Sequence, residues 1–133
     1  MASIINASTS NGIVQTADGS GILKCQANGV TTNALAWVNF GYVASAITVR
    51  SSYNVSSVTR ASTGTYTINY TNNTTDANYA VVGTTQGGAI NSGSGARALV
   101  PLTLTTSSVQ VINTAGVGSA EDSTLVCTAI FGN

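Results

Sequence analysis

The side chains able to do acid–base or metal chemistry are few in this chain. It has no histidine, and its four acids are Asp18, Asp76, Glu121 and Asp122. Without an imidazole, histidine-based proton relays and most metal sites are excluded. Glu121 and Asp122 are adjacent, so on a strand they would point to opposite faces instead of forming a catalytic pair. We therefore expect a solvated turn over 115–123, and a protein that is not an enzyme and holds no metal or cofactor.

The two cysteines, Cys25 and Cys127, lie near opposite ends of the chain. Two thiols without a histidine do not supply the four ligands of a tetrahedral zinc site. Two interpretations remain open. Buried free thiols that pack as small hydrophobic side chains are the favoured one, and a disulfide within or between subunits is the alternative. The amino terminus lacks the basic region and apolar core of a secretory signal, so we expect synthesis in a cytoplasm.

The charge balance narrows the possible partners. Four basic residues match the four acids, and charged residues make up 6% of the chain against about 25% in ordinary globular proteins. No basic stripe is present to neutralise a phosphate backbone, and no apolar run is long enough to span a bilayer, so neither nucleic acid nor membrane insertion is expected. With 43% hydrophobic residues and so few charges, part of the surface is expected to be buried against other copies of the chain.

The elements expected to position these residues are strands. Short apolar runs rich in Val, Ile, Thr and Tyr are separated by Asn-Gly and Asp-Gly pairs typical of tight turns. The segment 65–70 alternates strictly, which places Tyr66, Ile68 and Tyr70 on one face. The expected strands are 13–17, 21–26, 34–40, 46–52, 55–61, 64–70, 78–84, 97–105, 108–113 and 123–131.

Many short strands with glycine and asparagine turns predict an all-β fold, an antiparallel β-sandwich of jelly-roll type over 34–133. Residues 1–33 are expected to form an extended N-terminal arm, or else a flexible tail. Proline does not donate to a strand ladder, so Pro101 predicts an edge strand or a bulge. Trp37 is expected in the core, the alternative being an exposed sugar-stacking platform, and Tyr42 is expected to be the most exposed aromatic. The candidates for the core or for trimer contacts are Trp37, Phe40, Tyr66, Tyr70 and Phe131.

Four blocks follow one another in a distinctive order. They read AWVNF at 36–40, ITVRSSYNVSSVT at 47–59, TGTYTINY at 63–70 and DANYAVVG at 76–83. In this order they resemble a module found at the C-terminal ends of tail-fibre proteins of tailed bacteriophages. One departure is GYVASA at 41–46, where that family usually has a polar turn rich in glycine and threonine.

The resemblance implies a virion structural protein that is usually a homotrimer. Its implied partners are other copies of itself, other virion proteins contacted through the N-terminal arm, and a host surface glycan or protein. We expect a fibre-type module for host attachment, located in the virion. The alternative is a capsid decoration or cement protein, or a head appendage, with no receptor role.

Receptor contacts are predicted in the segments that lack a strand pattern. The glycine-rich segment 84–96 is interpreted either as a variable receptor-binding tip or as a long flexible connection, and 116–122 is a weaker candidate. The receptor-contact candidates are Gln86, Asn91, Arg97 and Tyr42.

Overall fold

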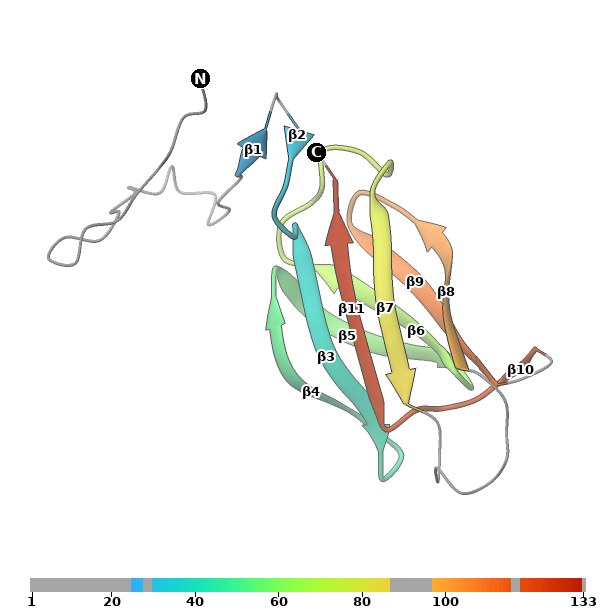
Figure 1. The fold of residues 1–133 in the computed structure, drawn as a ribbon. Coiled ribbons are helices and arrows are strands. Elements are labelled where there is room, and N and C mark those ends of the chain that lie inside the picture. Colours follow the sequence, from blue (N-terminus) through green and yellow to red (C-terminus); the bar gives the residue numbers. More distant parts are fainter. Residues whose placement is uncertain (1–24, 28–29, 87–96, 116–117, 133) are drawn as a thin grey trace, which may run out of the picture.

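The computed structural model describes residues 25–27, 30–86, 97–115 and 118–132, and this part of the chain consists of strands and turns (Figure 1). The strands are β1 (Gln26–Ala27), β2 (Val30–Thr31), β3 (Ala36–Val43), β4 (Ala46–Tyr53), β5 (Val55–Ser62), β6 (Thr65–Tyr70), β7 (Ala80–Gln86), β8 (Arg97–Leu104), β9 (Ser108–Ala115), β10 (Ser119–Ala120) and β11 (Leu125–Phe131).

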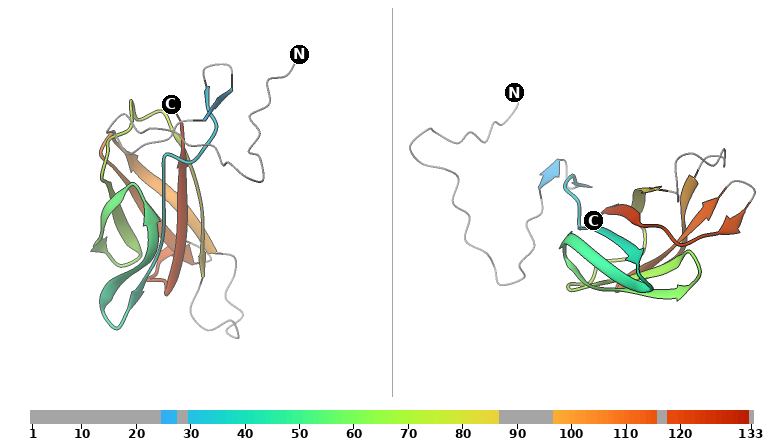
Figure 2. Two further views of the ribbon diagram at one scale, coloured as in Figure 1. Left: turned by 90° about the vertical axis from the view of Figure 1, so that its left-hand side faces the viewer. Right: turned by 90° about the horizontal axis from the view of Figure 1, so that it is seen from below.

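Two antiparallel sheets form the sandwich (Figures 1 and 2). The first, called here the four-stranded sheet, has the order β4-β3-β11-β7. The second, the five-stranded sheet, has the order β10-β9-β6-β5, and β8 also pairs with β9, along the edge opposite to β6. The strands β1 and β2 pair only with each other. The all-β prediction of two antiparallel sheets is therefore confirmed.

The connectivity differs from the predicted jelly roll, in which most successive strands alternate between the sheets. Here β3 and β4, β5 and β6, and β8 and β9 are each neighbours within one sheet. The first two pairs are joined by very short turns, 44–45 and 63–64. A turn of this length spans the roughly 4.8 Å between paired strands but not the roughly 10 Å between stacked sheets.

The core lies between the inner faces of the two sheets. Alternation along β3 buries Ala36, Val38 and Phe40, and β6 contributes Tyr66 and Ile68. The Phe40 and Tyr66 rings meet edge to face with centroids 5.1 Å apart. Such aromatic pairs stabilise the fold beyond the area that they bury. The other buried hydrophobic residues are Leu35, Val58, Tyr70, Tyr79, Val109, Val111, Val126 and Ile130.

Most predicted strands coincide with observed ones within a few residues. The expected strand 13–17 and nearly all of 21–26 lie outside the described residues. The two-residue strands β2 and β10 were not predicted. Pro101 lies on β8, at the edge of its sheet, and the β8–β9 register shifts between Pro101 and Thr103. The prediction of an edge strand or bulge is therefore confirmed.

The sandwich has two distinct ends (Figure 1). At the proximal end, the Leu35 amide donates to the Ile130 carbonyl, so the chain that precedes β3 joins the sandwich beside the end of β11. At the distal end, Gln86 lies opposite Leu125 and Arg97 lies opposite Ala115. The segment 87–96 leaves and rejoins the sandwich here, while the predicted arm would adjoin the other end.

Candidate functional site

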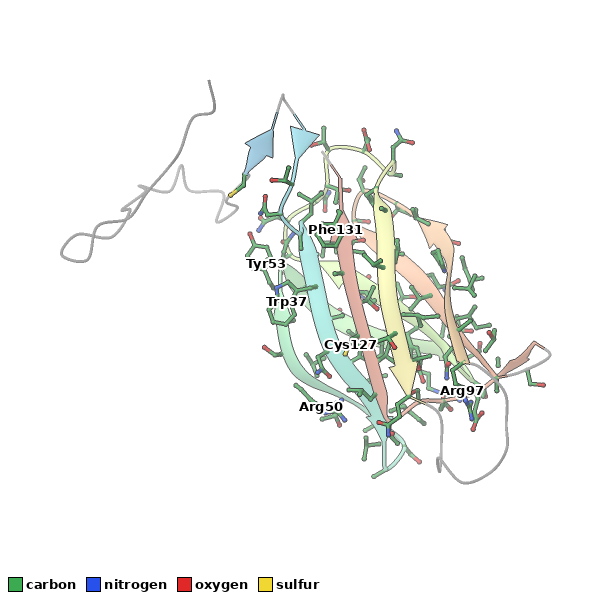
Figure 3. The ribbon with its side chains drawn as sticks, viewed as in Figure 1. Trp37, Arg50, Tyr53, Arg97, Cys127 and Phe131 are labelled. Atoms are coloured by element: carbon green, nitrogen blue, oxygen red, sulfur yellow. The ribbon has the colours of Figure 1, made fainter. Side chains whose placement is uncertain are left out.

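The outer face of the four-stranded sheet carries a row of cross-strand neighbours. Trp37 on β3 is paired with Tyr53 on β4 and with Ala129 on β11, and Ala129 is in turn paired with Val82 on β7. Because residues directly opposite each other on paired strands share a face, these four side chains lie on one side of the sheet. Two of them, Trp37 and Tyr53, are labelled in Figure 3. Trp37 is 38% exposed and Val82 is 54% exposed.

The next row on the same face contains Asn39, Cys127 and Thr84, again as cross-strand neighbours. Together the two rows line a shallow groove along β11, whose lining surface is almost wholly apolar. The groove exists because β11 contributes small side chains, Ala129 and Cys127, while Trp37 and Val82 project from the strands on either side. Phe131, 37% exposed, follows on β11 toward the proximal end.

Arg50 is the one charged residue within the four strands of this sheet, all of which the structure describes. Its Nη2 donates to the Thr124 carbonyl at 2.7 Å, and its Nη1 donates to Asn39 Oδ1 at 3.3 Å. The Thr124 carbonyl is able to lie this close to β3 because residue 41 is glycine. A Cβ at Gly41 would lie 2.1 Å from the Thr124 oxygen. The guanidinium is thus held against the sheet by neutral acceptors.

The outer face of the five-stranded sheet has a different character. Its exposed positions carry hydroxyls and amides that bond across strands. Asn69 donates to the Ser57 hydroxyl at 3.0 Å, and Gln110 donates to the Thr67 hydroxyl at 3.3 Å. Large exposed hydrophobic side chains on this sheet are found on the edge strand β8, at Val100 and Leu102. Away from β8, this face thus presents mostly hydroxyl and amide groups.

At the distal end, Asp122 collects four hydrogen bonds. Arg60 donates to its two oxygens through Nε at 2.9 Å and Nη2 at 2.8 Å. The Gly64 amide and the Tyr66 hydroxyl also donate to it, at 2.9 and 3.1 Å. The Arg60 bonds are the main reason that the pKa of Asp122 falls below its usual value, with the Gly64 and Tyr66 bonds adding to the effect. Burial raises the pKa of Tyr66 to about 12.

These contacts correct the prediction of a solvated turn over 115–123 at residues 121–123, while 118–120 are exposed as expected and 116–117 lie outside the described residues. Glu121 pairs with Arg97, and its backbone amide and carbonyl both bond to Asn113. The Ser123 hydroxyl donates to the Gln86 carbonyl. Sequence reasoning missed the partners because Arg60 and Asp122 are 62 residues apart, and only the tertiary fold brings them together.

Of the receptor-contact candidates, Gln86 and Arg97 both lie at the distal end, and Asn91 lies outside the described residues. Tyr42 packs against the core, with the Arg60 guanidinium 4.8 Å from its ring centroid. Trp37, not Tyr42, is therefore the more exposed aromatic. The expectation that Tyr42 is the most exposed aromatic is wrong, while its contact with a receptor stays a prediction.

Of the core candidates, Phe40, Tyr66 and Tyr70 are buried, whereas Trp37 and Phe131 lie on the outer face of the four-stranded sheet. The expectation that Trp37 packs inside the sandwich is wrong. An alternating strand has two faces, and the larger side chain on β3 does not decide which one turns inward. On β3 the face that turns inward carries Ala36, Val38 and Phe40, which are all apolar, whereas the other face carries Trp37 together with the polar Asn39. Trimer contacts through Trp37 and Phe131 stay a prediction.

The cysteines are both free, with Cys25 exposed and Cys127 half-buried. The prediction of burial is wrong for Cys25, because it precedes β1 outside the sandwich. Within the described ranges, no three side chains of the metal-ligating types gather into a group that would hold a metal ion. The described residues also contain no helix long and apolar enough to cross a bilayer.

Comparisons with known proteins give no match to this chain. No protein-family model matches it. No curated protein and no solved structure matches it significantly.

Proposed function

We propose that this chain is a bacteriophage virion structural protein, a homotrimeric fibre-type module for host attachment. The four sequence blocks within 36–83 support the virion assignment through their resemblance to tail-fibre modules. The largely apolar outer face of the four-stranded sheet, in whose strands Arg50 is the one charged residue, supports association between copies. In this proposal the N-terminal arm contacts other virion proteins.

The observation that carries the attachment role is that the two ends of the sandwich differ in what they hold. The chain that precedes β3 joins at the proximal end, beside Ile130. The anchors of the candidate recognition segments, Gln86 and Arg97, lie at the distal end with the 118–123 segment. A module held at one end and variable at the other suits attachment, because loops at the end of a rigid scaffold change without disturbing its core.

The distal end is held together by an ion pair and hydrogen bonds where the structure describes it. Arg97 pairs with Glu121, and Ser123 bonds to the carbonyl of Gln86, so both anchors of 87–96 are tied to the segment that leads into β11. Binding by one such end would be weak. Three copies that act together raise the apparent affinity by about 10²–10⁴ without any new contact.

The test is adsorption of labelled protein to a panel of bacterial strains. A variant with 87–95 shortened to a tight turn should keep its melting temperature and lose adsorption. The matched control replaces exposed Asn73 and Thr75, in the β6–β7 connection, by alanine and should adsorb normally. Unchanged adsorption by the shortened variant, or no adsorption of the wild type to any strain, would reject the attachment role.

The second candidate is a capsid decoration protein. The observation in its favour is that the charged side chains at the distal end are engaged within the chain, Arg97 with Glu121 and Arg60 with Asp122. Few charged groups of the described part are then left to recognise a receptor. Copy number distinguishes the candidates: a handful of copies per virion fits a fibre, and hundreds fit a capsid decoration.

A further inference from the structure

We propose that copies of this chain associate through the outer face of the four-stranded sheet, centred on Trp37, Val82 and Ala129. This inference rests on the self-association proposed above and assigns it to one surface. In a trimer the three copies of this face would meet around the symmetry axis, with Trp37 contacting a neighbouring copy.

The first argument is the cost of removing this face from water. Its exposed side chains are hydrophobic or small at most positions, and the groove along β11 presents almost no polar atoms. Arg50 already has two neutral acceptors, Asn39 Oδ1 and the Thr124 carbonyl, which a partner need not replace. Burial of the apolar part of this face therefore gains hydrophobic free energy. The Arg50 charge has no acidic partner within the described residues, so in this proposal its guanidinium stays at the hydrated rim of the interface.

The second argument is shape. The face carries both a projection and a hollow, because Trp37 and Val82 stand beside the small residues Ala129 and Cys127. A surface of this kind is able to fit a second copy of itself, with the indole of one chain over the groove of the next. Tryptophan is also among the residues that most often dominate interface energy.

The third argument is the contrast between the two outer faces. Ser57, Thr67, Asn69 and Gln110 pair with one another on the five-stranded sheet, which satisfies a water-facing surface. The same chain exposes Trp37 and Phe131 on the other sheet, whereas the large exposed hydrophobic residues of the five-stranded sheet are confined to its edge strand β8. A difference of this kind within one small sandwich is expected when only one face is covered in the assembled protein.

The size of the face sets the expected strength. With about 4.8 Å between strands and about 3.3 Å per residue, four strands of roughly seven residues cover roughly 19 by 23 Å. This footprint of roughly 440 Å² is about half of the roughly 800 Å² per partner that specific interfaces typically bury, which is the size of a weak or transient contact. We therefore expect association in the micromolar range.

The chemistry of the groove argues against a glycan as its occupant. Trp37 offers a flat ring, but a sugar also needs convergent hydrogen-bonding groups to replace its water. The nearby Asn39 amide oxygen already accepts from Arg50, and the lining is nearly devoid of polar surface. An apolar protein surface fits this lining better.

The decisive experiment compares two arginine variants by light scattering. Val82 is the most exposed large hydrophobic residue of the face, so Val82→Arg should fold and shift the assembled protein to the 13.3 kDa monomer. Thr59→Arg, on the opposite outer face, should leave assembly unchanged. Retention of assembly by Val82→Arg overturns the proposed interface, as does a wild-type monomer at high micromolar concentration.

A second measurement uses the two thiols and does not depend on a substitution that perturbs the face. In the assembled protein a maleimide should modify exposed Cys25 quickly and Cys127 slowly, because Cys127 lies in the groove. Dilution below the association range should accelerate the reaction of Cys127 at least tenfold and leave that of Cys25 unchanged. Equal protection of Cys127 at all concentrations overturns the inference.

The outcomes separate this inference from the attachment role. If the wild type adsorbs to cells and Val82→Arg stays assembled, the interface is wrong while the function stands. If Val82→Arg dissociates and no bacterial strain binds the wild type, the interface stands while the attachment role fails.

Discussion

Asp122 is the residue with the widest influence on the distal end. One carboxylate accepts from Arg60 on β5, from the Gly64 amide in the β5–β6 turn and from the Tyr66 hydroxyl on β6. The Tyr66 hydroxyl accepts in turn from the Ser123 amide. The residue that begins the approach to β11 is thereby joined to the facing sheet, and the network fixes where the distal segment lies.

Asp122→Asn should lower the free energy of unfolding at neutral pH by about 1–3 kcal/mol, because charge-assisted hydrogen bonds are lost. The pKa of Asp122 is lowered in the folded state. Its stabilisation is therefore complete above the unfolded value of 3.8 and is lost as the pH falls through the lower folded value. Urea unfolding at about pH 7 and about pH 2 should show a smaller acid loss in the variant than in the wild type.

Asp76→Asn is the matched control, because the Asp76 carboxylate accepts from the Asn78 amide two residues along the chain. It should shift the unfolding midpoint less than Asp122→Asn does. An acid profile of Asp122→Asn identical to that of the wild type would mean that the network does not stabilise the fold.

Phe40 is the buried aromatic residue of β3, although Trp37 on the same strand is larger. Phe40→Ala should cost about 3–5 kcal/mol, since Phe40 is fully buried against Tyr66. Trp37→Ala should cost less than about 1 kcal/mol in the monomer, because the indole lies on the outer face. Denaturation followed by circular dichroism below the association range checks both, and a larger cost for Trp37→Ala would place the indole in the core after all.

At the scale of elements, the β3–β4 hairpin is the clearest case of a turn whose residues do not match its geometry. Ala44 and Ser45 adopt φ values of 50° and 64°, in the left-handed region. Two-residue hairpin turns of this kind favour Asn-Gly, and other residues are strained there. This explains how GYVASA continues β3 and still closes a hairpin.

The double variant Ala44→Asn/Ser45→Gly should therefore raise the free energy of unfolding by about 1–2 kcal/mol without altering the sheet. The opposite change is the control. Gly64 has φ of 67°, and a Cβ there would lie 2.6 Å from the Glu121 nitrogen, so Gly64→Ala should be destabilising. Thermal unfolding of the two variants beside the wild type gives the comparison. A lower melting temperature for the double variant would show that the Ala44–Ser45 turn is not strained.

The strands were predictable because alternation and β-branched residues are local signals. Residues 65–70 alternate strictly, and β6 occupies Thr65–Tyr70. Which face turns inward was not predictable for β3, since that depends on what the other sheet offers. The partners of Asp122 and Glu121 were missed for the same reason, because they come from β5, β6, β8, β9 and the β5–β6 turn, and no local pattern encodes them.

For the molecule as a whole, the positions of the few charged side chains distinguish the distal end from the outer face of the four-stranded sheet. Of the described arginines, Arg60 and Arg97 are paired with Asp122 and Glu121 at the distal end. Arg50 is held by neutral acceptors. Both ion pairs of the described residues thus lie at the distal end, and the outer face of the four-stranded sheet carries neither of them. Association through that face would be driven by hydrophobic burial.

If hydrophobic burial drives association, the response of the association constant to salt is predictable. Screening weakens contacts between exposed charges but hardly affects apolar burial, and sulfate strengthens burial because it is excluded from protein surfaces. The association constant should therefore change less than about twofold between about 50 and about 500 mM sodium chloride, and it should rise in sodium sulfate. Sedimentation velocity over a concentration series measures both. A fall of the association constant by tenfold or more in sodium chloride would indicate an interface held by charged side chains. The ion pairs of Arg60 and Arg97 at the distal end would then have to supply those charges.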